Sequence, residues 1–257
     1  MIRYVDTHTH LYDAAYEGDG AGAVRRAVEA GVPKMVMADT DESVRDAMFS
    51  LCEAFPENAF PTLGLHPTEF KDDRWKEELS LLEGYMDRKI VAVGEIGIDL
   101  HWRSDNLDIQ KEVFRRQVEL ALAKNLPIII HNREATGQIF NVLDDYRGLG
   151  LRGVFHAYSG SIETFRELDR YGDFLVGIGG VLTFKKASIA QTVESIPLER
   201  IVLETDSPYL TPTPYRGTRN ESAHIPLIAA KLSEIKRVPI EEVAAVTTAN
   251  AERLFNI

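Results

Sequence analysis

The sequence of 257 residues contains one cysteine, Cys52, so no disulfide can form within the chain. A lone cysteine is typical of proteins from a reducing compartment. The sequence has no run of about 18 apolar residues, so no transmembrane helix is predicted, and the N-terminus lacks the cationic and apolar segments of a signal peptide. We therefore predict a cytoplasmic protein that makes no contact with a membrane. Cys52 follows Val44, Met48 and Leu51 at helical spacing, which predicts a buried thiol and not a nucleophile.

Positive charge is also scarce. The chain has 40 acidic and 29 basic side chains, a net charge of −11, and no basic run. Proteins that coat duplex DNA without sequence preference normally present a basic face. The composition therefore argues against a protein that grips long duplexes. It favours one that binds a DNA end or a small substrate through metal ions and a few arginines.

Short apolar segments rich in β-branched residues alternate with helical patterns along the chain. Eight segments are predicted to be strands: Ile2–Asp6, Lys34–Ala38, Ala59–Leu65, Ile90–Glu95, Pro127–His131, Gly153–His156, Phe174–Ile178 and Arg200–Glu204. Eight strand–helix units in about 250 residues are typical of a (β/α)8 barrel. Gly31 and Asn125 are predicted helix ends, and Ile240–Phe255 is predicted to be one further helix. No linker interrupts the pattern, so residues 1–257 are predicted to form one α/β domain, a TIM-like barrel with an additional C-terminal helix.

Metal-binding side chains stand where predicted strands end. The six are His8, His10, Glu95, His131, His156 and Asp206. In a β/α barrel the carboxyl ends of the strands converge on one opening, so residues distant in sequence can surround the same ions. Four histidines and two carboxylates suit two divalent ions, such as Zn, Mn, Fe, Co or Ni, and Mg less well. A single histidine after a strand is more often a hydrogen-bonded core or loop residue, so the prediction depends on the whole set.

Spacing within two motifs predicts which side chains point together. Because side chains alternate along a strand, His8 and His10 should face the same way, and so should Glu204 and Asp206. Asp6 shares the parity of the histidine pair and is a candidate to support it.

Other polar residues near the predicted opening are candidates for binding substrate. His66 follows a predicted strand, and we favour a substrate contact for it; a third metal site and a loop-capping role are the alternatives. The guanidinium groups of Arg133, Arg216 and Arg219 suit phosphate oxygens. Each arginine taken alone is as readily a solvated surface residue.

Three features outside the predicted metal site have competing interpretations. His101 and His224 follow no predicted strand and are expected to be solvated or structural. The turn Tyr158–Ser161 either cradles an anion through its backbone N–H groups or supplies a helix cap at Ser161.

Seven motifs in a fixed order carry a resemblance to a known family: DTHTHL, GLHP, VGEIGID, HNREA, HAYSGS, ETDSPYL and YRGTRNE. The sequence resembles the TatD family of metal-dependent deoxyribonucleases, within the amidohydrolase-like barrels, nearly from end to end. The resemblance implies a TIM-like barrel, metal ligands at the six residues above, and hydrolysis of phosphodiester bonds in DNA, often from a 3′ end. The chain departs from the family at Ser222, at His224 and at Leu100-His101-Trp102, which puts its substrate preference in doubt.

On this basis we predict a 3′–5′ exodeoxyribonuclease that acts on single-stranded or frayed ends with two divalent metal ions, and no obligate protein partner is inferred. Glu95 is predicted to bridge the ions, and Asp206 to ligate one ion and accept a proton from the attacking water. Glu204 is predicted either to contact substrate or to orient a neighbouring ligand, and His66, Arg133 and Arg216 to contact substrate. The alternatives are hydrolysis of an amide, lactone or aminoacyl ester, or a catalytically silent barrel.

Overall fold

The computed structural model describes residues 2–257 and contains eight parallel strands. They are β1 (Val5–Thr9), β2 (Lys34–Met37), β3 (Ala59–Pro61), β4 (Val93–Asp99), β5 (Ile128–Arg133), β6 (Arg152–Phe155), β7 (Asp173–Ile178) and β8 (Ile201–Leu203). The strands pair in sequence order as β1-β2-β3 and β4-β5-β6-β7-β8. Parallel bridges between Leu63 and Val93 and between Thr9 and Ser207 join the two sheets into a ring. The predicted (β/α)8 barrel is confirmed.

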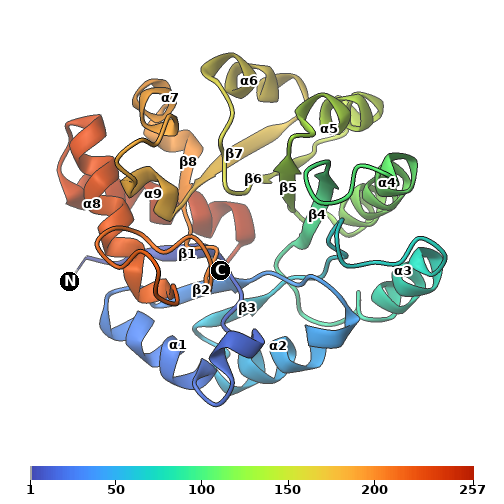
Figure 1. Ribbon diagram of the computed structural model, residues 1–257, viewed down its shortest axis with the longest axis horizontal. Coiled ribbons are helices and arrows are strands. Elements are labelled where there is room, and N and C mark those ends of the chain that lie inside the picture. The colour runs from blue at the N-terminus through green and yellow to red at the C-terminus, as the bar shows by residue number, and fades with distance from the viewer. Residues whose placement is uncertain (1) are drawn as a thin grey trace.

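Helices α1 to α8 surround this ring, and α9 packs against its amino end (Figure 1). They are α1 (Gly20–Glu29), α2 (Glu42–Ala54), α3 (Trp75–Gly84), α4 (Leu107–Lys124), α5 (Thr136–Leu143), α6 (Ile162–Glu167), α7 (Ile189–Ser195), α8 (Ile225–Lys236) and α9 (Ile240–Phe255). Six 3-10 turns complete the elements: η1 (Ala14–Tyr16), η2 (Asp144–Tyr146), η3 (Leu168–Arg170), η4 (Gly180–Thr183), η5 (Leu198–Arg200) and η6 (Ser222–His224). Within residues 2–257, none of the helices combines the length and apolar character that a membrane crossing requires.

Local signals in the sequence set several helix ends. The Ser161 side chain accepts a hydrogen bond from the Thr164 N–H and caps α6, so the cap interpretation of the Tyr158–Ser161 turn is confirmed. Asn125, directly after α4, is left-handed at φ 51°, and Gly31, just beyond α1, has φ 88°. Both residue types tolerate this conformation, so both predicted helix ends are confirmed.

Apolar side chains fill the interior of the barrel. A buried cluster inside the ring receives side chains from β1, β2 and β5 to β8, and it includes Val36, Ile129 and Val202. Leu254 and Phe255 of α9 join this cluster from the amino end of the strands, and the C-terminus lies near the centre of the ring in Figure 1. Full burial of one such side chain contributes roughly 1.5–3 kcal/mol. Because α9 closes this end of the barrel, a site that combines polar groups from several strands can form only at the carboxyl end.

Every strand differs in its bounds from the sequence prediction. β2 and β5 to β8 differ by one or two residues at an end, β3 ends at Pro61 and not at Leu65, and β1 and β4 are shifted toward their carboxyl ends. β1 begins three residues later than predicted and continues to Thr9, because Thr9 pairs with β2 and the Thr7 hydroxyl donates to the Leu203 carbonyl of β8. β4 likewise continues past Glu95 to Asp99, which pairs with Arg133 of β5. Hydrogen bonds with neighbouring strands thus extend both strands beyond their apolar segments. His8 consequently lies within β1 and not after it, and Glu95 lies inside β4 and not at its end.

Candidate metal centre

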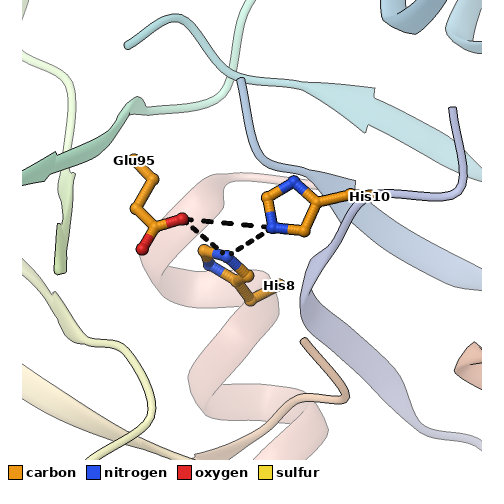
Figure 2. A group of neighbouring side chains, drawn as sticks. All are labelled: His8, His10 and Glu95. Carbon is orange, nitrogen blue, oxygen red and sulfur yellow. Dashed lines mark hydrogen bonds and ion pairs between the residues drawn. The ribbon is translucent and has the colours of Figure 1, made fainter. Parts of the chain in front are cut away.

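The Glu95 carboxylate lies between two groups of histidines. Its Oε2 atom is 3.1 Å from His8 Nε2 and 4.0 Å from His10 Nε2. Figure 2 shows these three side chains pointing toward one another. On its other side, Glu95 Oε1 is 2.8 Å from His131 Nδ1 and 3.8 Å from His156 Nε2. The structure therefore brings side chains from β1, β4 and β5 and from the end of β6 to one point at the carboxyl end of the barrel.

Asp206 faces the same point from the segment after β8. Its Oδ1 atom is 3.6 Å from His10 Nε2 and 3.7 Å from the Nε2 atoms of His8 and His156. β8 ends at Leu203, and Asp206 has a positive φ of 56°, so the extended backbone assumed for Glu204 and Asp206 is wrong. The Asp206 N–H donates instead to the His8 carbonyl (2.9 Å), which fixes the turn against β1.

The donor set of this cluster fits divalent cations. The Nε2 atoms of His8, in β1, and His10, directly after it, lie 3.2 Å apart, so the two side chains face the same way as predicted. Neutral imidazole nitrogens and carboxylate oxygens both offer lone pairs, and a cation between them satisfies all of them at once. Three overlapping groups could hold an ion: His8, His10 and Glu95; His8, His156 and Asp206; and His66, Glu95 and His131.

Electrostatics within the cluster keep the carboxylates ionised. Burial alone would raise the pKa of Glu95, but the surrounding histidines hold it well below its usual value. The pKa of Asp206 is likewise lowered, because the nearby histidines outweigh its burial. Burial would lower the pKa of His131 and of His156, yet neighbouring carboxylates raise these values to about 9 and about 10. Without metal, the cluster therefore neutralises its carboxylates with protons on histidine.

Two buried carboxylates hold the histidines on the Oε1 side of Glu95. Asp99 Oδ2 lies 2.9 Å from His131 Nε2, and Glu204 Oε1 lies 3.1 Å from His156 Nδ1. Glu204 is 1% exposed, and its Oε1 also accepts the N–H of Ala157 at 2.6 Å. Carboxylates behind metal-binding histidines fix the ring and increase its basicity. This geometry favours the orienting role of Glu204 over a substrate contact.

The sequence prediction did not identify several supporting residues. The Tyr12 hydroxyl lies 2.9 Å from His10 Nδ1, which is also 3.0 Å from the Ala38 carbonyl. On α4, the fully buried side-chain amides of Gln110 and Gln117 each pair with both the N–H and the C=O of one backbone residue, Asp99 and Leu65 respectively. A polar glutamine on the buried face of a helix is the sequence signal that could have revealed these contacts.

His66 lines the cavity above the cluster and also lies beside Glu95. Its Nε2 atom is 3.5 Å from Glu95 Oε1, and its ring centroid is 4.4 Å from that of His131. Its Nδ1 lies 2.8 Å from the Thr68 hydroxyl. This position is compatible with a substrate contact. It is equally compatible with a role as a metal ligand, which is one of the alternatives drawn from the sequence.

A cavity of about 1100 Å³ opens above the cluster. His131, His156 and Asp206 lie along its wall, and Arg133 and Arg216 line it as well. Its size suits a ligand of nucleotide dimensions. The cavity thus places both arginines beside the candidate metal centre.

Arg219 does not join the cavity lining. Its guanidinium stacks over the Tyr16 ring at 4.3 Å and pairs with Asp19. Arg26 also pairs with Asp19 and reaches Glu221 at 2.6 Å. These contacts tie α1 to the segment before η6, so Arg219 is a structural residue.

Three other predictions of structural roles agree with the structure. Cys52 is 5% exposed, and burial raises the pKa of its thiol to about 12. His224 Nδ1 lies 2.9 Å from Asn220 Oδ1, and the His224 ring stacks beneath Tyr215. His101 pairs with Glu134 at 2.9 Å on the surface. None of the three reaches the candidate metal centre.

Comparison with known proteins identifies the family. A family profile described as TatD related DNase matches residues 5–256. The chain belongs to the TatD family. YabD of Bacillus subtilis (strain 168), named a metal-dependent hydrolase, is 38% identical over 98% of both chains. YjjV of Escherichia coli (strain K12), also named a metal-dependent hydrolase, is 31% identical over 100% of this chain and 99% of its own.

TatD family members of known structure have the same fold. The crystal structure of YjjV, described as a TatD homologue, matches with a TM-score of 0.90 at 29% identity and covers 100% of this chain and 99% of its own. A TatD family hydrolase from Entamoeba histolytica matches with a TM-score of 0.87 at 22% identity, over 99% of this chain and 98% of its own. The protein is therefore a metal-dependent hydrolase built on a TIM-like barrel.

Proposed function

We propose that this protein is a deoxyribonuclease that uses two divalent metal ions to remove nucleotides from the 3′ ends of single-stranded or frayed DNA. The observation that carries the proposal is the position of Glu95. One of its oxygens faces His8 and His10, and the other faces His131 and His156. A carboxylate with ligand groups on both sides would be able to bind two ions at once.

The metal ions would make a water molecule acidic enough to attack at neutral pH and would stabilise charge on phosphoryl oxygens. Zn, Mn, Fe, Co and Ni suit the mixed nitrogen and oxygen donors, and Mg suits them less well. His8, His10, His131, His156 and Asp206 would hold the ions together with Glu95. Glu204 and Asp99 would orient His156 and His131 through the ring nitrogens that they contact.

Asp206 is our candidate for the group that receives the proton of the attacking water. The lowered pKa of its carboxyl keeps it ionised at neutral pH, so its oxygens have free lone pairs. Its Oδ1 atom lies within 3.7 Å of three histidines of the cluster, and the residue lines the cavity that would admit substrate. A proton acceptor has to reach both the centre and the substrate, and Asp206 meets both conditions.

Phosphate binding is assigned to the two arginines of the cavity. Arg133 and Arg216 each lie against an aromatic ring, at 5.3 Å from Trp102 and 4.0 Å from Phe184. Stacking holds the plane of a guanidinium and leaves its N–H edge for phosphate oxygens. With a net charge of −11 and few such contacts, the protein should engage a short terminal segment and not a long duplex.

Hydrolysis of linear and circular DNA tests the proposal. A single-stranded oligonucleotide labelled at its 5′ end should shorten stepwise with metal present, and a closed circle of the same sequence should resist. Rapid cutting of circles would mean an endonuclease. Failure to cleave any DNA, with cleavage of an amide, lactone or aminoacyl ester in parallel assays, would replace the nuclease with the alternative hydrolase.

Matched variants link that activity to the candidate site. Asp206→Asn should abolish the shortening. Asp173→Asn provides the control, because Asp173 is exposed at the amino end of β7, the opposite end of the barrel from the cluster. Equal loss of activity in both variants would show that the change at Asp206 acts through general damage to the protein.

A further inference from the structure

Exposed aromatic side chains gather at one end of the barrel. Among the large hydrophobic side chains exposed in residues 2–257, three are aromatic: Trp102, Tyr209 and Tyr215. Trp102 follows β4, and the two tyrosines follow β8, so all three lie on loops at the carboxyl ends of strands. Trp102 is 67% exposed, the highest value in this group, and it lines the cavity above the candidate metal centre. An indole left in water beside a cavity indicates a binding surface.

The backbone that carries Trp102 is held in place. Asp99 Oδ1 accepts the N–H groups of Trp102 at 2.7 Å and His101 at 2.9 Å. The other oxygen of the same buried carboxylate contacts His131 Nε2 at 2.9 Å. Asp99 therefore fixes the turn that carries the indole and the orientation of a candidate metal ligand together. The Trp102 backbone is separated from His131 by a single carboxylate group.

The chemistry around Trp102 matches a nucleotide. The Arg133 guanidinium lies 5.3 Å from the centroid of the indole, and both side chains line the cavity. An aromatic platform next to a guanidinium offers a stacking surface for a base and a partner for the adjoining phosphate. Every base has a π-face, so such a platform accepts unpaired bases of any sequence. A base inside a duplex is already stacked on both faces and cannot use it.

We propose that Trp102 is the stacking platform for an unpaired nucleobase of the substrate, and that this contact selects single-stranded ends. The assignment rests on the proposed deoxyribonuclease function for the identity of the substrate. It explains how a chain with a net charge of −11 binds a polyanion: stacking supplies affinity that few phosphate contacts can provide.

Tryptophan fluorescence tests the contact independently of hydrolysis. The chain has two tryptophans, so Trp75→Phe leaves Trp102 as the only one. The metal-loaded Trp75→Phe protein would be titrated with hexathymidylate that has phosphorothioate linkages, which resist hydrolysis. We expect strong quenching with the hexathymidylate and little with an abasic oligomer of equal length and charge or with a blunt duplex. Equal quenching by the abasic oligomer would overturn the proposal, because binding would then depend on phosphate alone.

Steady-state kinetics on labelled single strands provide the second measurement. Trp102→Ala should raise KM on the order of 10-fold or more and change kcat little, consistent with the loss of one stacked base. Trp102→Phe keeps an aromatic face and should restore most of the affinity, and Trp75→Phe should behave as wild type. An unchanged KM in Trp102→Ala would overturn the platform.

The two measurements separate this inference from the proposed function. Quenching by the hexathymidylate in a protein that hydrolyses no DNA would support the platform and refute the nuclease. Hydrolysis of single-stranded ends with no quenching and an unchanged KM in Trp102→Ala would support the nuclease and refute the platform.

Discussion

Replacing Glu204 by glutamine removes one negative charge from behind His156 and keeps the length of the side chain. In the native protein, Glu204 Oε1 lies 3.1 Å from His156 Nδ1 and accepts the Ala157 N–H at 2.6 Å. The amide oxygen of glutamine can still accept from Ala157. The attraction that orients the His156 ring and favours a proton on Nδ1 is weakened. We expect looser binding of the ion on the Oε1 side of Glu95.

The expected magnitude follows from the position of the carboxylate. Loss of a group that supports a metal ligand typically costs 10–100-fold in metal affinity or activity, or about 1.4–2.8 kcal/mol. Glu204 is 1% exposed, so solvent cannot replace it. Gly177 packs closely against Glu204 Oε2, since a Cβ added at Gly177 would lie 2.0 Å from this atom. This crowding favours an effect in the upper half of the range. The new NH2 group would occupy this confined space.

Metal titration by calorimetry, followed by turnover at saturating metal, measures the effect. Glu199→Gln is the matched control, because Glu199 is exposed in η5, which leads into the opposite end of β8. Circular dichroism establishes whether each variant folds. If Glu204→Gln binds the same number of ions with native affinity and turns over normally, Glu204 does not support His156 as argued.

The remaining predictions concern the base, the metal and pH. Asp206→Asn should lower kcat by roughly 10²–10⁴-fold and weaken DNA binding much less, because a proton acceptor acts in the transition state. If rapid-quench kinetics show near-normal turnover in this variant, Asp206 is not the proton acceptor. Chelation should stop hydrolysis while circular dichroism stays native, since the apolar core lies away from the cluster; full activity in verified metal-free protein would contradict a metal requirement. The pKa values of His131 and His156, raised to about 9 and about 10 in the metal-free cluster, mean that metal binding at pH 7 should release about two protons. Metal affinity should therefore increase as pH rises from 7 to 10, and heats of binding that are equal in buffers of different ionisation enthalpy would refute this. In the metal-free protein, the same raised pKa values contribute stability that is complete below about 6.5 and is lost as pH rises through 9 to 10, which urea titrations can follow.

The sequence alone determined the fold and the membership of the candidate cluster. Eight apolar segments alternate with helical patterns. A parallel strand that is apolar on both faces needs neighbouring strands for its backbone hydrogen bonds and helices to bury its side chains, and a β/α barrel provides both. The additional helix was predicted at Ile240–Phe255, the range observed for α9. The histidine pair His8 and His10 could be placed on one face because the period of a strand is fixed at two residues.

Only the tertiary structure decided how the cluster is arranged. That Glu95 presents its two oxygens to different histidines depends on the barrel bringing distant strands together. The turn at Asp206 depends on a hydrogen bond to the His8 carbonyl, a contact between residues far apart in sequence. Strand periodicity predicted a different geometry there, because periodicity describes a regular backbone and cannot include long-range contacts.

The roles of individual polar side chains show the same division. Arg133 and Arg219 are equivalent in charge and in their predicted closeness to the opening, yet Arg133 lines the cavity and Arg219 binds Asp19. Gln110 and Gln117 gave no motif, but each pairs with the backbone of a segment that leads to the cluster. Residue type sets which bonds a side chain can make, and the packing of elements decides which partner it meets. The sequence therefore determined which polar groups are available, and the folded barrel decided which of them lie at the candidate metal centre and which make structural contacts elsewhere.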